Sequence, residues 1–270
     1  MSTIGFIGGG NMAQALVEGI LKAGLVPPGD IIVSDISVSR LEFLEKSCRV
    51  RIAADNAALA GTADVVILAV KPQQADGVLT EIAGRLKPGA LVISIAAGIT
   101  TGRILGVLGL VQVVRVMPNT PALVGQGASA MFSANASKEN LALADKLFSS
   151  VGLVLTVPRE DLMDAVTAVS GSGPAYFFLL MEQLIEAGVR LGLSRQAATK
   201  LVIQTARGAA ELAVSAAEKN ETPTELRKKV TSPGGTTEAA IRVFEEHNFA
   251  AVVLHALTAA CQRSKQLSTQ

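Results

Sequence analysis

The sequence predicts an α/β domain with a mainly parallel sheet over residues 1–158, followed by an all-helical domain over residues 159–270. Two observations favour this division. In the first part, short apolar runs rich in β-branched residues alternate with segments whose apolar residues recur every three or four positions. This alternation is typical of a parallel sheet that helices cover on both faces. From Glu160 onward only the helical spacing remains.

Eight apolar runs are the expected strands of the first domain. They lie at residues 3–8, 31–35, 50–53, 65–70, 91–95, 111–116, 128–132 and 153–157. Helical spacing between them is clearest at residues 13–23, 41–46 and 74–86. The order of these runs predicts a sheet built from consecutive strand–helix–strand units.

The second domain has its own helix boundaries. The sequence Ser-Gly-Ser-Gly-Pro at 170–174 interrupts one helical pattern, and a Gly-Leu-Ser turn at 192–194 separates the next two. Thr222, Pro223 and Glu225 have the spacing of a capping box with proline in the first helical position, so a helix should begin there. A turn at 230–236 then precedes two further helices that run from Thr237 to the end.

Charge and composition exclude several classes of function. Lys and Arg number 24 against 23 Asp and Glu, which leaves no basic surface for nucleic acid. The chain is 49% hydrophobic, yet it has no apolar run of about 18 residues that would predict a membrane span. The excess of Ala, Leu and Val therefore favours an oligomer interface.

The two cysteines, Cys48 and Cys261, are far apart and lack the spacing of a metal site, so we expect no bound metal. No basic, signal-like segment precedes the first apolar run. Together these features favour a protein of the reducing cytoplasm.

A glycine-rich motif follows the first expected strand and opens the first helix. Its residues, in the pattern G-x-G-x-x-A, are Gly8, Gly9, Gly10, Asn11, Met12 and Ala13. Gly8 permits a tight turn, Gly10 allows close approach of a pyrophosphate, and Ala13 allows close packing of helix and strand. The helix N-terminus adds free N–H groups for the phosphates. The motif predicts a Rossmann-like, dinucleotide-binding domain.

The end of the second strand bears on the choice of dinucleotide. Asp35 lies where an acidic residue would bind a ribose 2′-hydroxyl and repel a 2′-phosphate, which favours NAD. Ser34, Ser37 and Arg40 would instead hold that phosphate, which favours NADP. The sequence leaves both cofactors open, with NADP preferred.

Later strand ends carry further candidate cofactor contacts, because open α/β sheets bind ligands at the carboxyl ends of their strands. The candidates are Ala69, Val70, Lys71 and Pro72 after the fourth strand, Ala96, Ala97 and Gly98 after the fifth, and Asn119 after the sixth. Asn119 lies in a rigid Met-Pro-Asn-Thr-Pro loop, a suitable place for the nicotinamide.

The turn at residues 231–237 is the best candidate for a small carboxylate. It reads Thr-Ser-Pro-Gly-Gly-Thr-Thr, with two glycines that free backbone N–H groups and with several hydroxyls beside a helix N-terminus. A plain helix cap is the alternative interpretation of the same residues.

Six blocks in this order resemble the pyrroline-5-carboxylate reductases. They are I-G-G-G-N-M-A at 7–13, A-V-K-P at 69–72, A-A-G at 96–98, M-P-N-T-P at 117–121, D-A-V-T-A-V-S-G-S-G-P-A-Y at 164–176 and V-T-S-P-G-G-T-T-E-A-A-I at 230–241. The resemblance covers nearly the whole chain. It implies hydride transfer from NADPH or NADH to 1-pyrroline-5-carboxylate, giving L-proline, by a homodimer joined through the helical domain. In the family such dimers are often assembled further into rings of dimers.

The resemblance also assigns residues. It implies cofactor contacts from Ser34, Asn56, Val70, Lys71 and Ala97 besides the glycine loop. It implies that Thr237 binds the ring nitrogen as the catalytic residue, and that the substrate carboxylate is held by Ser232 and the backbone of Gly234, Gly235 and Thr236. Glu160 matches a position near the substrate in some relatives. Lys229 departs from the family, because some relatives have Asn there.

Two rival interpretations remain. A β-hydroxyacid or 6-phosphogluconate-type dehydrogenase would need a lysine base in the helix after Gly173, and residues 175–190 contain no lysine. A cofactor-sensing regulator without catalysis would explain residues 1–158 but not the turn at 231–237. Reduction of an iminium needs no strong acid, which agrees with only two histidines, His247 and His255, both outside the motifs.

Overall fold

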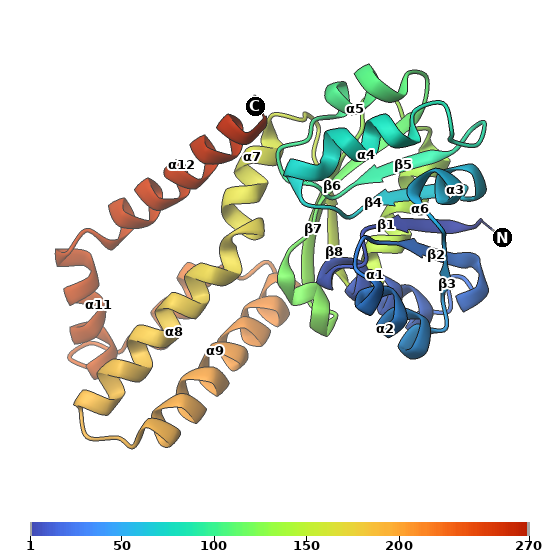
Figure 1. Cartoon of the computed structure of the whole chain (residues 1–270). Coiled ribbons are helices and arrows are strands. Elements are labelled where there is room, and N and C mark those ends of the chain that lie inside the picture. The colour runs from blue at the N-terminus through green and yellow to red at the C-terminus, as the bar shows by residue number, and fades with distance from the viewer. Residues whose placement is uncertain (1, 269–270) are drawn as a thin grey trace. The chain divides into compact units, whose positions relative to one another are not determined.

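The computed structural model describes residues 2–268, in which eight strands form one sheet in the order β3-β2-β1-β4-β5-β6-β7-β8 (Figure 1). The strands are β1 (Ile4–Ile7), β2 (Ile31–Ser34), β3 (Arg51–Ile52), β4 (Val65–Leu68), β5 (Leu91–Ser94), β6 (Gln112–Met117), β7 (Gly127–Phe132) and β8 (Gly152–Thr156). β1 to β6 are parallel, whereas β7 pairs antiparallel with β6 and parallel with β8. Each of the eight predicted strands is confirmed.

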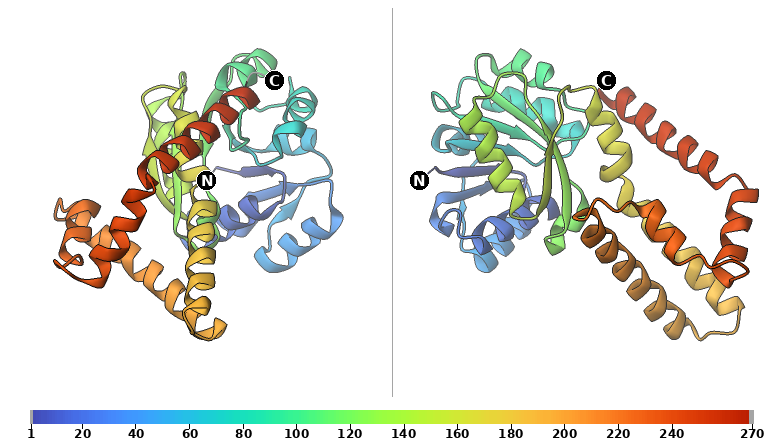
Figure 2. Two further views of the ribbon diagram at one scale, coloured as in Figure 1. Left: turned by 90° about the vertical axis from the view of Figure 1, so that its left-hand side faces the viewer. Right: turned by 180° about the vertical axis from the view of Figure 1, so that it is seen from behind.

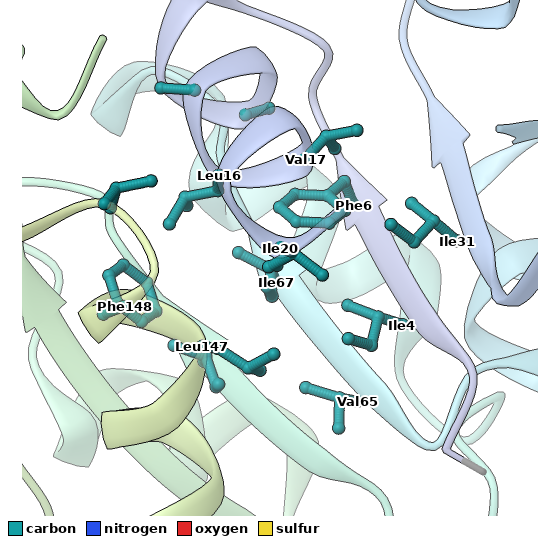
Figure 3. Packing of buried hydrophobic residues seen from close by; sticks show 14 of the residues in the cluster. Ile4, Phe6, Leu16, Val17, Ile20, Ile31, Val65, Ile67, Leu147 and Phe148 are labelled. Atoms are coloured by element: carbon teal, nitrogen blue, oxygen red, sulfur yellow. The ribbon is translucent and has the colours of Figure 1, made fainter. Parts of the chain in front are cut away.

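Helices cover both faces of the sheet (Figures 1 and 2). One apolar cluster joins the sheet to α1 (Asn11–Lys22), α2 (Val38–Cys48) and α6 (Lys138–Ser149). The other joins it to α3 (Asn56–Thr62), α4 (Ala75–Ile82) and α5 (Thr101–Leu108). Side chains alternate between the two clusters, because successive residues of a strand point to opposite faces. Ile4 and Phe6 pack under α1 (Figure 3), whereas Ile7 belongs to the cluster on the other face.

Three short 3₁₀ helices lie in the loops of the sheet. They are η1 (Pro28–Asp30), η2 (Pro72–Gln74) and η3 (Thr120–Val124).

Residues 162–268 form helices joined by short connections, as predicted. Its elements are α7 (Leu162–Val166), the π-helical turn η4 (Thr167–Gly171), α8 (Gly173–Arg190), α9 (Arg195–Ala217), α10 (Pro223–Lys229), α11 (Thr236–Glu246) and α12 (Phe249–Ser268). The predicted interruption at 170–174 coincides with the end of η4. The capping box of α10 is confirmed: Glu225 N donates to Thr222 Oγ1 at 3.3 Å, and Thr222 N donates to Glu225 Oε2 at 2.7 Å.

The chain forms two compact units whose boundaries lie inside helices. Among the described residues, unit 1 comprises residues 2–174 and 258–268, and unit 2 comprises residues 175–257. This division differs from the predicted boundary at 158/159, which follows the change from α/β to all-helical sequence. The physical reason is packing. Met163 and Ala168 are buried, and the Ser264 hydroxyl of α12 donates to the Asp164 carboxylate of α7 at 2.6 Å. The α7–η4 segment and the end of α12 therefore belong to unit 1.

Unit 2 buries very little of its own apolar surface. Within residues 175–257 only Ala198 and Ala216 are buried, although the helices are rich in Leu, Val and Phe. No helix within residues 2–268 combines the length and the hydropathy needed to span a membrane. A unit of this size without a core of its own needs another surface to pack against.

Candidate cofactor and substrate sites

The glycine loop lies at the carboxyl end of β1, where the strand order reverses between β1 and β4. Gly8 has a φ of +100°, and a Cβ there would lie 2.6 Å from the Ala69 carbonyl oxygen, so only glycine fits. Asn11 and Met12 begin α1, which has no side-chain cap, and Ala13 is fully buried. A Cβ on Gly10 would meet nothing within 4 Å. The open space and the uncapped helix fit a dinucleotide pyrophosphate.

The end of β2 is tied to the glycine loop and to α3. Gly8 N donates to the Ser34 carbonyl at 2.8 Å. The buried Ser34 hydroxyl donates to Asn56 Oδ1 at 2.7 Å, and Asn56 Nδ2 donates to Glu81 Oε2 at 2.7 Å. The structure therefore brings Ser34 and Asn56 together beside the loop, and their contacts with the cofactor stay a prediction.

Asp35 and Arg40 both bind the backbone of the glycine loop. Gly9 N donates to Asp35 Oδ2 at 2.6 Å, and Arg40 Nε donates to the Gly9 carbonyl at 2.8 Å. Neither contact is visible as a sequence pattern.

Two further loops follow at the same edge of the sheet. Residues 69–72 touch the glycine loop through the close approach of Ala69 and Val70 to Gly8, and the Lys71 side chain is exposed. Residues 96–98 follow β5. Gly98 has a φ of +76°, and a Cβ there would lie 3.1 Å from the backbone of Leu267 in α12.

Asn119 is buried, and both the nitrogen and the oxygen of its side-chain amide form hydrogen bonds. Its Nδ2 donates to the Ser170 carbonyl at 3.0 Å, and its Oδ1 accepts from Ala128 N at 2.9 Å. These contacts brace the loop after β6 against β7 and η4. The predicted contact with the nicotinamide stays a prediction.

Glu160 belongs to a polar cluster that the sequence analysis missed. Its carboxylate accepts from Thr101 N at 2.8 Å, from Thr101 Oγ1 at 2.7 Å and from Arg115 Nη1 at 3.1 Å. The Arg115 side chain is only 5% exposed, inside the apolar strand β6. An arginine within an apolar strand was the sequence feature that could have indicated this cluster, because a buried charge requires a partner of opposite charge. The cluster fixes the start of α5, and the implied contact of Glu160 with the substrate stays a prediction.

The turn predicted to bind the substrate lies in unit 2, between α10 and α11. Gly235 N donates to the Ser232 carbonyl at 3.0 Å, and Gly234 has a φ of +70°. Gly234 N donates to Glu238 Oε2 at 2.8 Å. The N–H groups of Gly234 and Gly235 are thus engaged within the turn, whereas the implied carboxylate site uses both.

The N–H groups at the start of α11 are better placed to receive an anion. Thr236 and Thr237 occupy its first two positions, whose N–H groups have no partner inside a helix, and neither donates another hydrogen bond within residues 2–268. The helix has no side-chain cap, and a Cβ on Gly235 would lie 2.6 Å from Ser232 Oγ. The Ser232 hydroxyl therefore lies at this opening.

A cleft of about 700 Å³ adjoins the turn inside unit 2. Gly234, Gly235 and Glu238 line it together with Arg227 and Arg242.

Lys229 precedes the turn and forms an ion pair with Glu221. This ion pair engages the ammonium group of Lys229 within unit 2, and the departure from the family at this position leaves a cofactor contact from Lys229 in question.

Taken together, the two sites define a class of protein. A glycine loop at the switch point of a parallel sheet, with a helical unit that carries a candidate anion-binding turn, is the arrangement of a two-domain NAD(P)-dependent oxidoreductase. Residues 3–98 match the family model described as NADP oxidoreductase, coenzyme F420-dependent, and residues 160–267 match the model for pyrroline-5-carboxylate reductase dimerisation.

Relatives narrow the class to a family. A pyrroline-5-carboxylate reductase of Pseudomonas aeruginosa is 47% identical over 100% of this chain and 99% of its own length. A solved pyrroline-5-carboxylate reductase of Coxiella burnetii is 45% identical, with a TM-score of 0.92 over 99% of this chain and 98% of that one. The Plasmodium falciparum enzyme, solved with NADP bound, is 33% identical with a TM-score of 0.87 over 99% and 98%. The chain belongs to the pyrroline-5-carboxylate reductase family.

Proposed function

We propose that the protein reduces 1-pyrroline-5-carboxylate to L-proline with NADPH or NADH, the last step of proline biosynthesis. The proposal rests on the presence of two features in one chain. The first is the open glycine loop at the start of α1, and the second is the uncapped start of α11 at Thr236 and Thr237, which follows the Ser-Pro-Gly-Gly turn. The first binds the cofactor that the family shares, and the second suits a small carboxylic acid.

At the cofactor site the first N–H groups of α1 bind the pyrophosphate, and Ser34 and Asn56 lie at the adenosine side. Residues 69–72 and 96–98 border the crevice toward the nicotinamide. The reduced nicotinamide, when bound, supplies the hydride. The chain contributes orientation, since a fixed angle of approach between donor and acceptor lowers the barrier without any acid or base.

At the substrate site the N–H groups of Thr236 and Thr237, with the Ser232 hydroxyl, hold the carboxylate, aided by the positive end of the α11 dipole. Thr237 Oγ1 accepts a hydrogen bond from the N–H of the protonated imine. This bond sets the ring so that one face of the C=N carbon is presented to the cofactor. Hydride addition at that carbon cancels the positive charge and leaves the secondary amine of proline.

The working form is proposed to be a homodimer joined through unit 2. Support comes from the exposed apolar side chains of α8, α9, α11 and α12 and from the match of residues 160–267 to a dimerisation model. Assembly of dimers into a ring is a further step of the same proposal. Sedimentation at micromolar concentration should give twice the chain mass of 27.8 kDa, or an even multiple of it. A monomer would contradict the proposed dimer.

The proposed compartment is the cytoplasm, where NADPH is available. Both cysteines are free thiols in residues 2–268, which is compatible with a reducing environment.

Oxidation of NADPH and NADH, followed by absorbance after addition of 1-pyrroline-5-carboxylate, tests the activity. The proposal predicts rapid oxidation, with NADPH as the better donor. Bound cofactor without any oxidation would mean that the turn in unit 2 serves another ligand.

A further inference from the structure

The peptide groups on both sides of Gly9 are held by charged side chains from the β2–α2 region. The N–H of Gly9 donates to Asp35 Oδ2 at 2.6 Å, and its carbonyl accepts from Arg40 Nε at 2.8 Å. Gly9 is the middle residue of the glycine loop, so these two bonds set the direction of the backbone that faces the pyrophosphate.

The Asp35 carboxylate is engaged at both oxygens. Besides the bond from Gly9, Asp35 Oδ1 accepts from Ser37 N at 2.7 Å. An acidic residue that distinguishes NAD from NADP must direct an oxygen at the ribose hydroxyls. In this protein both oxygens are directed at backbone N–H groups.

Arg40 is fixed by more than the Gly9 carbonyl. Its Nη2 donates to Gln14 Oε1 of α1 at 3.0 Å, and its guanidinium carbon lies 5.1 Å from the centre of the Phe43 ring. A planar guanidinium can hold two acceptors at once, which the single ammonium of lysine does less well. Arg40 therefore links α2 to both the loop and α1.

Peptide planarity connects these bonds to the cofactor. In a trans peptide the C=O and the N–H point in opposite directions. Because Arg40 draws the Gly9 carbonyl toward itself, the N–H of Gly10, in the same peptide, points away from Arg40. That N–H donates no hydrogen bond within residues 2–268, and Gly10 borders open space. It is one of the donors that a pyrophosphate would meet.

We propose that Asp35 and Arg40 are positioning residues that fix the Gly9 backbone for pyrophosphate binding, and that Asp35 does not select between NADP and NAD. The inference deepens the proposed function, since it rests on the use of a nicotinamide dinucleotide. The pyrophosphate is common to both cofactors. A defect in its binding site must therefore weaken both cofactors by the same factor.

The test is calorimetric titration of the purified full-length protein with NADP⁺ and with NAD⁺, in the absence of any imine. Asp35→Asn keeps the size of the side chain but offers an NH₂ group to one of the two backbone donors. We expect the affinity for each cofactor to fall roughly tenfold, with the NADP⁺/NAD⁺ ratio unchanged within about twofold. Asp30→Asn, at the opposite end of β2, removes the same charge and should change neither affinity.

Arg40→Lys provides a second, charge-conserving variant that acts on the other side of Gly9. It should also weaken both cofactors in parallel, with its thermal unfolding measured to establish that it is folded. A rise in NADP⁺ affinity, or a tenfold change in the ratio for Asp35→Asn, would show that Asp35 faces the ribose and would overturn the proposal. Unchanged affinities in both variants would overturn it as well. Because no imine is present, an enzyme with another substrate would leave this result standing.

Discussion

The Glu238 carboxylate accepts a hydrogen bond from the Gly234 N–H at 2.8 Å, within the turn proposed to bind the substrate carboxylate. As the third residue of α11, Glu238 stabilises the helix through its dipole. It also places a negative charge next to the proposed position of the substrate carboxylate, which is negative as well. Helix stability and substrate affinity are therefore opposed at this residue.

Replacing Glu238 by Gln should lower the KM for 1-pyrroline-5-carboxylate about threefold to fivefold and leave kcat nearly unchanged. The reason is the loss of a like-charge repulsion of roughly 1 kcal/mol in a solvated setting. Steady-state kinetics of the variant measure the change, with Glu218→Gln on the exposed end of α9 as the matched control. An increased KM would mean that Glu238 shapes the turn for substrate rather than opposing it.

Thr237→Ala should reduce kcat/KM by at least tenfold, because it removes a hydrogen bond to a charged nitrogen worth about 1.5–3 kcal/mol. Thr237→Ser keeps the hydroxyl and should retain most of the activity. Thr224→Ala, on the exposed start of α10, is the control for loss of a threonine hydroxyl in unit 2. If kcat/KM of the alanine variant falls by much less than tenfold, Thr237 does not bind the imine nitrogen as proposed.

Glu160→Ala should lower the free energy of unfolding of the protein by about 3 kcal/mol, because it leaves Arg115 buried without its partner. Urea denaturation measures this loss. The double variant Glu160→Leu with Arg115→Met, which removes both charges, should recover a large part of it. If instead stability is unchanged and only the KM for the imine rises, Glu160 contacts substrate as the family resemblance implies.

The hydrogen bonds of Asp64 make the free energy of unfolding depend on pH. The hydrogen bond from Lys87, together with that from Thr3 N at 2.8 Å, holds the pKa of this carboxyl below its ordinary value near 4. A carboxyl whose folded pKa is depressed stabilises the fold above its unfolded pKa, and this contribution is lost as the pH falls through the folded pKa.

Asp64→Asn should therefore be less stable than the parent protein at pH 7, and the difference should shrink steadily below about pH 4. Urea midpoints of both proteins between pH 7 and pH 3 give the comparison. A difference that is independent of pH would indicate that the carboxyl makes no charge-dependent contribution.

The sequence predicted the elements of the fold well, because each has a local cause. Eight apolar runs became strands, and the Thr222–Glu225 capping box opens α10 as its spacing indicated. The compact boundary at Pro174 was not predictable, since it depends on packing between α7 and the end of α12, about 100 residues apart in the chain.

The candidate site was predicted in its residues but not in their partners. Asp35 was recognised from its place after β2, yet its bonds to Gly9 and Ser37 depend on three-dimensional geometry. Likewise, spacing could not reveal that Glu238 already occupies the Gly234 N–H. The partner of Arg115 could have been expected from the sequence, because a charged residue within an apolar strand indicates a buried partner of opposite charge.

Transfer of a labelled hydride tests the proposed reaction most directly. NADPH carrying deuterium at the reactive position of nicotinamide C4 is incubated with 1-pyrroline-5-carboxylate and the enzyme, and the product is analysed by mass spectrometry and NMR. The proposed reaction gives proline with one deuterium at C5, the former imine carbon, on a single face of the ring. Proline without deuterium, or no proline while the cofactor stays reduced, would contradict it.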